Sequence, residues 1–274
     1  MRHLLAALPL LLAAPLPAAA EQLSAAETAV EHVALIDGWR DPDGSRVAAI
    51  EIRLAPGWHT YWRVPGSVGI PPSFDWSQSR NLASVAYDWP RPTFFDTAGG
   101  RSFGYDGALV LPVRLVPADP SAPLDVHLAL DFGVCNDICV PAEAHLDARL
   151  TPETAPAGRA RIEAALAEGA QGAGEAGVTG VTCALAQGDG GYALTARITF
   201  GSDPGPGQVA VLEPGQPDLW IGEAESLTDG RTLVARAPVA GRGKAGPVVE
   251  RQTLRLTVLD DRRAVDIQGC AGPG

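Results

Sequence analysis

Two of the four cysteines in the chain lie close together, Cys135 and Cys139, with three residues between them. A disulfide needs Cα atoms within about 4.4–6.8 Å, whereas four extended residue steps span about 13 Å. The segment must therefore fold back, and Asn136 and Asp137 are turn-forming residues. Pro141 then prevents a helix from continuing. The spacing alone leaves open a redox-active pair and a structural staple, with a metal-binding pair third.

The metal alternative is delivery of Cu(I), because soft thiolates bind that ion and His59 or His145 could join the cysteine pair. The only methionine is the initiator, so the chain offers no thioether ligand after it. The sequence contains neither a nucleophile elbow nor a zinc-spaced histidine pair, which excludes the common hydrolase classes. We expect no metal and no cofactor.

The first twenty residues have the pattern of a secretory signal peptide. Arg2 precedes an apolar run over residues 4–16, and Ala18 and Ala20 stand three and one before Glu21. We expect cleavage after Ala20, export to the periplasm and no stable membrane insertion, since no later segment is apolar for long enough. In an oxidising compartment the four cysteines would form disulfides.

Length and composition predict two β domains. The chain has 274 residues, 46% of them hydrophobic, with 31 Gly and 24 Pro, so it can bury two cores and is rich in turn formers. A formal net charge of −11 and a pI near 4.8 argue against nucleic acid and anionic lipid as partners.

Apolar and polar residues alternate with a period of two in several parts of residues 30–150, which predicts the strands that position the cysteine pair. Val126, Leu128, Leu130 and Phe132 alternate with polar neighbours and lead directly to Cys135. Similar patterns begin at residue 45, recur at 74–76 and 85–90, and continue at 109–116, where a proline predicts an edge strand. Residues 21–31 show no strong pattern and are expected to be a mobile lead-in. Short strands without alternating helices predict a β-sandwich.

Two aromatic-rich stretches interrupt these strands. Residues 58–66 are expected to pack in the core, with a partner surface as the alternative. Residues 91–106 are expected to form a long Gly- and aromatic-rich loop, which inside a compact domain is usually functional or disordered. Its aromatic residues argue against disorder.

The second half repeats the strand pattern after a break. Residues 151–177 are expected to be a linker with one short helix at 159–168, and residues 178–274 a second, smaller sandwich. Cys183 and Cys270 lie near its opening and closing strands. Four cysteines allow three pairings, and we predict Cys135–Cys139 together with a structural Cys183–Cys270 bridge, since each pair then stays within one domain.

A set of ordered motifs resembles the N-terminal periplasmic domain of the thiol:disulfide interchange protein DsbD and its ScsB-like relatives. The similarity covers roughly residues 30–150, and only weaker similarity to the second domain of ScsB-like relatives extends beyond. The motifs are GWHTYW at 57–62, PG at 65–66, IPP at 70–72, FGY at 103–105, LVLPV at 109–113 and CVP at 139–141.

The resemblance implies an all-β chain of two immunoglobulin-like sandwiches joined by a short helical linker, with Cys135 and Cys139 as the catalytic pair. Cys139 would form the link to partners and Cys135 would resolve it. An aromatic cap should shield the pair from within residues 93–105. The expected cap residues are Phe94, Phe95, Asp96, Phe103 and Tyr105.

The implied partners are a membrane-embedded thiol-disulfide electron donor and periplasmic thioredoxin-like or disulfide isomerase-like proteins. Two features depart from the family. The cysteines are closer together than in the DsbD domain, and the transmembrane and thioredoxin-like parts are absent, so the donor would be a separate protein. Asp137 between the cysteines disfavours a thiolate, and we expect no strongly acidic cysteine unless a backbone amide or an arginine compensates.

A different class of function also fits: two stapled sandwiches that bind a partner without exchanging electrons. The redox behaviour of the cysteines separates the two, because structural disulfides have potentials below about −300 mV.

Overall fold

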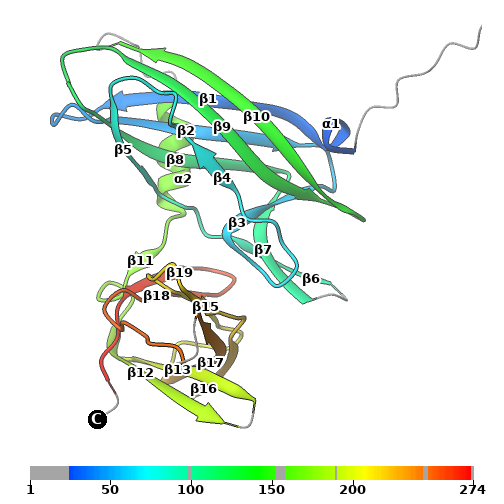
Figure 1. Ribbon diagram of the computed structural model, residues 1–274, viewed down its shortest axis with the longest axis vertical. Coiled ribbons are helices and arrows are strands. Elements are labelled where there is room, and N and C mark those ends of the chain that lie inside the picture. The colour runs from blue at the N-terminus through cyan, green and yellow to red at the C-terminus, as the bar shows by residue number, and fades with distance from the viewer. Residues whose placement is uncertain (1–24, 98–99, 152–157, 189, 243–245, 273–274) are drawn as a thin grey trace, which may run out of the picture.

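The computed structural model describes residues 25–97, 100–151, 158–188, 190–242 and 246–272. The expected signal peptide at 1–20 lies outside these residues. The expected all-β fold is confirmed, as two β-sandwiches follow one another along the chain (Figure 1). Within the described residues the helices are α1 (Ala25–Ala29) and α2 (Arg159–Ala167).

The first sandwich contains ten strands in two antiparallel sheets. One sheet has the order β1-β2-β8-β5, and the other has the order β10-β9-β3-β7-β6 with β4 added to β9. Their bounds are β1 Val30–Arg40, β2 Arg46–Leu54, β3 His59–Gly66, β4 Ser73–Asp75, β5 Leu82–Tyr87, β6 Thr93–Thr97, β7 Gly100–Asp106, β8 Ala108–Pro117, β9 Leu124–Cys135 and β10 Cys139–Leu150.

The second sandwich also has two sheets. One has the order β11-β19-β18-β14, and the other has the order β12-β13-β17-β15 with β16 added to β17. The bounds are β11 Gln171–Gly172, β12 Val178–Gly188, β13 Gly191–Phe200, β14 Val209–Glu213, β15 Leu219–Ile221, β16 Glu225–Asp229, β17 Thr232–Gly241, β18 Arg255–Leu259 and β19 Ala264–Gln268.

The long hairpin β9–β10 presents the first cysteine pair. Every second residue of β9 from Leu124 to Phe132 is buried, as the alternation predicted, and these side chains join the core of the first sandwich. Cys135 is the last residue of β9 and Cys139 the first of β10, and the two are directly paired. The turn between them closes the hairpin.

The prediction that residues 21–31 form a mobile lead-in is wrong for residues 25–31, the part that the structure describes. Residues 25–29 form α1, and β1 starts at Val30 and pairs with β2 along most of its length. Because β1 is an edge strand whose side chains are mostly half-buried, its sequence lacks a clean alternation. Pairing with β2 orders it instead.

The prediction of a long loop at residues 91–106 is also wrong, because most of these residues form the hairpin β6–β7. Gly104 shows why the sequence concealed a strand. A Cβ atom there would lie 1.9 Å from the carbonyl oxygen of Thr60 on β3, so only glycine allows β7 to approach β3 this closely. The glycines that resembled loop residues therefore permit sheet formation.

The edge position predicted from Pro112 is wrong for the strand as a whole, since β8 lies between β2 and β5. The pairing of β5 nevertheless ends at Val113, one residue away. Asp88 donates a backbone hydrogen bond to the Pro112 carbonyl at 3.0 Å, which places the proline nitrogen on the side where β5 has ended. The missing N–H thus removes no ladder hydrogen bond.

Helix α2, expected within the linker, packs on the first sandwich. Its Ile162 is fully buried among Ile36, Val47 and Ala49 on the outer face of the β1-β2-β8-β5 sheet. Arg161 forms an ion pair with Glu51 at 2.7 Å. The helix is therefore fastened to the first domain.

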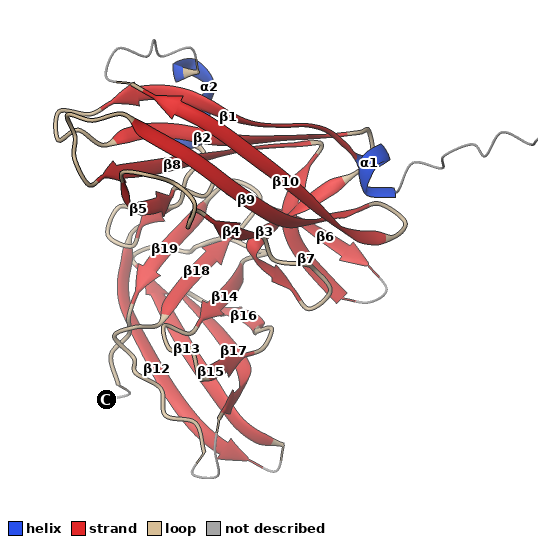
Figure 2. Ribbon diagram, turned by 45° about the horizontal axis from the view of Figure 1, so that its top comes forward, coloured by secondary structure: helices blue, strands red, loops and turns tan. Residues whose placement is uncertain are grey.

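The two sandwiches share a contact surface at β3, β14 and β18 (Figure 2). Arg63 on β3 forms a two-pronged ion pair with Glu213 at 3.0 and 2.8 Å, and also donates to Thr257 at 3.0 Å. Val211 and Leu259 of the second sandwich pack against the core of the first. Charge and apolar contact both hold the junction.

Candidate functional site

The two sulfurs of the Cys135–Cys139 disulfide differ in their exposure. Cys135 is 7% exposed at the end of β9, whereas Cys139 is exposed at the start of β10. Ile138 beside it is 58% exposed. Cys139 is therefore the sulfur that faces solvent, while Cys135 faces the protein.

Residues of strand β3 contact both cysteines of the site. His59 is paired with Cys135 in the ladder between β3 and β9. Two residues on, the Tyr61 hydroxyl donates a hydrogen bond to the Cys139 sulfur at 3.1 Å. Burial raises the pKa of Tyr61, so this hydroxyl stays protonated at neutral pH.

The hairpin β6–β7 reaches the site through Phe95. The Phe95 ring stacks on the His59 ring with centroids 4.1 Å apart, and His59 also meets Tyr61 edge-on at 5.5 Å. Burial lowers the pKa of His59, while the charge of Asp106 opposes that shift. The histidine is thus largely neutral at pH 7, and an aromatic layer covers the strand beside the disulfide.

The other residues expected in a cap occupy different positions. Phe103 and Tyr105 are core residues of the first sandwich, and the Tyr105 hydroxyl donates to the Pro90 carbonyl at 2.7 Å. Phe94 packs edge-on against Phe103, and Asp96 pairs with an arginine of the same hairpin at 2.7 Å. Of the five residues, Phe95 is the one that stacks on a residue paired with the disulfide.

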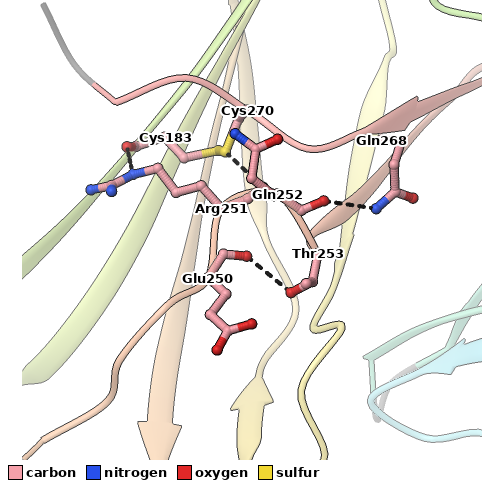
Figure 3. Close-up of a disulfide and its surroundings, with 7 residues drawn as sticks. All are labelled: Cys183, Glu250, Arg251, Gln252, Thr253, Gln268 and Cys270. Carbon is pink, nitrogen blue, oxygen red and sulfur yellow. Dashed lines mark hydrogen bonds between the residues drawn. A yellow bond between two sulfur atoms is a disulfide. The ribbon is translucent and has the colours of Figure 1, made fainter.

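The second disulfide joins Cys183 on β12 to Cys270 just after β19, as predicted (Figure 3). Cys183 is fully buried and Cys270 is 7% exposed. The Arg251 side chain donates to the Cys183 carbonyl at 3.0 Å and lies beside the bridge. This disulfide is enclosed in the core of the second sandwich.

Comparison with known proteins places the first sandwich in a family. Residues 23–151 match the family model described as thiol:disulfide interchange protein DsbD, N-terminal. Over these residues the chain is similar to the DsbD N-terminal domain. The match contains the whole region of similarity recognised at 30–150. The cysteine pair, the GWHTYW motif on β3 and the hairpin β6–β7 all lie within the matched residues.

The whole two-sandwich chain is similar to a solved structure, the N-terminal periplasmic domain of ScsB from Proteus mirabilis. The sequences are 24% identical, the TM-score is 0.66, and the alignment covers 88% of this chain and 92% of that one. The fold is therefore shared across both sandwiches. The search of curated proteins found no match.

Sequence reasoning missed Tyr61 as a neighbour of the Cys135–Cys139 disulfide, whereas His59 had been considered beside the pair only as a ligand in the copper alternative. Tyr61 was assigned to the core, which is correct for its ring, since the residue is 2% exposed. The contact of its hydroxyl with sulfur depends on a partner 78 positions away in sequence. The spacing of His59 and Tyr61, two apart on one strand, was the only local signal.

No helix in the described part of the chain is long and apolar enough to cross a membrane. Within the same residues, no three or more His, Cys, Asp and Glu side chains group as a metal site would require.

Proposed function

We propose that this protein is a periplasmic thiol-disulfide exchange component that passes electrons through Cys135 and Cys139. The observation that carries the proposal is the unequal exposure of the two sulfurs within a DsbD N-terminal domain. Exchange by two cysteines needs one accessible sulfur to join a partner and a second to resolve the mixed disulfide. Cys139 suits the first role and Cys135 the second.

The reaction starts from the reduced pair. The Cys139 thiolate attacks a partner disulfide, forms a mixed disulfide and releases one partner thiolate. The Cys135 thiolate then attacks the Cys139 sulfur, closes Cys135–Cys139 and releases the second partner thiolate. Two electrons pass to the partner, which takes up two protons, and the domain leaves oxidised.

Renewed turnover requires a dithiol donor that reduces Cys135–Cys139 by the reverse sequence. We assign this role to a membrane-embedded thiol-disulfide protein, and the acceptor role to periplasmic thioredoxin-like or isomerase-like proteins. The secretory pattern at residues 1–20 supports the compartment. The similar ScsB domain from Proteus mirabilis is periplasmic, which supports it as well.

The test is to trap mixed disulfides in living cells. In Cys135→Ser the partner should stay attached to Cys139, because the resolving thiol is missing. Cys139→Ser is the matched control, since it keeps one thiol but leaves it buried, and it should trap little. Non-reducing gels followed by mass spectrometry would identify the adducts.

Absence of adducts in both variants, with normal folding, would contradict electron exchange and favour a non-redox binding module. Adducts on Cys135 alone would reverse the assigned roles. Tight binding of Cu(I) by the reduced protein, lost in either variant, would instead support the copper alternative.

A further inference from the structure

The Tyr61 hydroxyl occupies an unusual place for a buried tyrosine. The residue is 2% exposed, yet its oxygen lies 3.1 Å from the sulfur of the exposed Cys139. Among the described residues, no other side chain donates a hydrogen bond to either sulfur of this pair. A buried side chain therefore donates a hydrogen bond to the exposed sulfur of the pair.

Two glycines form a slot that fixes the direction of the Tyr61 ring. A Cβ atom on Gly133 of β9 would lie 2.8 Å from ring atoms Cδ2 and Cε2, and one on Gly69 would lie 2.8 Å from Cδ1. Real Cβ contacts are essentially never this short. The ring is thus held between two backbone segments that come this close only because they lack side chains.

The charges around the pair give a thiolate little other support. Asp137 lies in the turn between the cysteines, and Asp96 on the hairpin is bound to Arg101. His59, paired across the ladder with Asp106, has its pKa lowered by burial. In the described structure no arginine donates a hydrogen bond to either sulfur, so none offsets the negative charge of Asp137. The donor to the Cys139 sulfur is the neutral Tyr61 hydroxyl.

We propose that Tyr61 is a catalytic residue of the exchange reaction, donating its hydroxyl hydrogen bond to the Cys139 thiolate. The inference rests on the proposed function and adds a residue to its site. When reduced Cys139 loses its proton, the negative charge develops on the sulfur that Tyr61 already contacts. Hydrogen bonds to charged groups are stronger than neutral ones. Tyr61 keeps its proton throughout, and the exchange still moves two electrons from the cysteine pair to the partner.

The direct test uses a protein with a single thiol at this site, Cys135→Ser, without any partner. The rate of alkylation of Cys139 by iodoacetamide is measured against pH, and its midpoint reports the ionisation of the thiol. Tyr61→Phe removes the donor and keeps the ring in its slot. The midpoint should rise by about one to two pH units, the equivalent of one charge-assisted hydrogen bond.

Tyr105→Phe is the matched control, because it removes a buried hydroxyl that donates to the Pro90 carbonyl instead of to sulfur. Its alkylation midpoint should equal that of the parent. Equal midpoints in Tyr61→Phe and the parent would overturn the proposal.

A second measurement avoids any loss of fold. Replacing the tyrosines by 3-fluorotyrosine makes the phenols more acidic with little change in shape, so the hydrogen bond to sulfur strengthens. The midpoint should then fall, and an unchanged midpoint would count against Tyr61. The alkylation assay contains no partner, so its result does not depend on the proposed exchange function. If the midpoint shifts but trapping of mixed disulfides fails, the hydrogen bond is established and the exchange function is contradicted.

Discussion

At the scale of single residues, the two disulfides of this chain share one bond type but have opposite surroundings. Cys139 is exposed beside an exposed isoleucine, whereas Cys183 is completely buried. Accessibility to an attacking thiolate controls exchange, since the sulfur must be approached before it can react. Position in the fold therefore leaves one sulfur of the first pair accessible and encloses the second pair.

We predict that a mild dithiol opens Cys135–Cys139 before Cys183–Cys270. The first bridge spans 4 positions and gains little from loop closure, whereas the second spans 87. In the chain-entropy treatment a loop of that length contributes roughly 4–5 kcal/mol to the free energy of unfolding. Stepwise alkylation with mass detection measures the order. Equal resistance of both bridges would favour the binding-module alternative.

At the scale of elements, the hairpin β6–β7 places one aromatic residue toward the core and its neighbour toward the site. Phe94 packs on Phe103, and Phe95 stacks on His59. Successive residues of a strand point to opposite faces, so the two adjacent phenylalanines have different roles. Of the two rings, Phe95 is the one that stacks on the residue paired with Cys135.

We predict that Phe95→Ala speeds alkylation of the reduced Cys135 and Cys139 thiols and leaves the fold intact. The alanine removes the ring that covers His59 beside the pair, which opens the approach to sulfur. Phe94→Ala is the neighbouring control, expected to lower thermal stability more than it changes alkylation, because that ring packs on the core. If Phe95→Ala folds and its thiols react no faster, the hairpin is not a cap.

At the scale of the whole molecule, strand β3 joins the site to the second sandwich. His59 and Tyr61 lie beside the disulfide, and Arg63 on the same strand binds Glu213 and Thr257 across the junction. The Arg63 guanidinium also lies over the buried Trp62 ring at 4.0 Å. The second domain thus contacts the strand that lies beside the Cys135–Cys139 disulfide.

We predict that Arg63→Ala weakens the coupling between the two sandwiches. Both partners of the ion pair are largely buried, so removing one leaves Glu213 unpaired at a cost of about 1–3 kcal/mol. Scanning calorimetry should show the unfolding transitions of the domains moving apart. Arg255→Ala, which breaks an ion pair inside the second sandwich, is the control. Unchanged cooperativity in Arg63→Ala would show that the apolar contacts alone couple the domains.

Local pattern determined much of this protein. The alternation in β9, the fold-back required by Cys135 and Cys139 and the helix near residue 160 were all readable, because each depends on neighbours within a few positions. The pairing of the other two cysteines also followed, since each pair then stays within one domain. The ordered motifs indicated the family of the first sandwich, which the family model then matched.

Tertiary structure alone decided which side chains meet at the disulfide and the junction. Tyr61 contacts Cys139 across 78 positions, and Arg63 contacts Glu213 across 150. Residues 91–106 became a hairpin because Gly104 lets β7 lie close against β3. Contacts of this kind arise when sheet pairing brings distant segments together, and alternation within one segment carries no information about which partner it will meet.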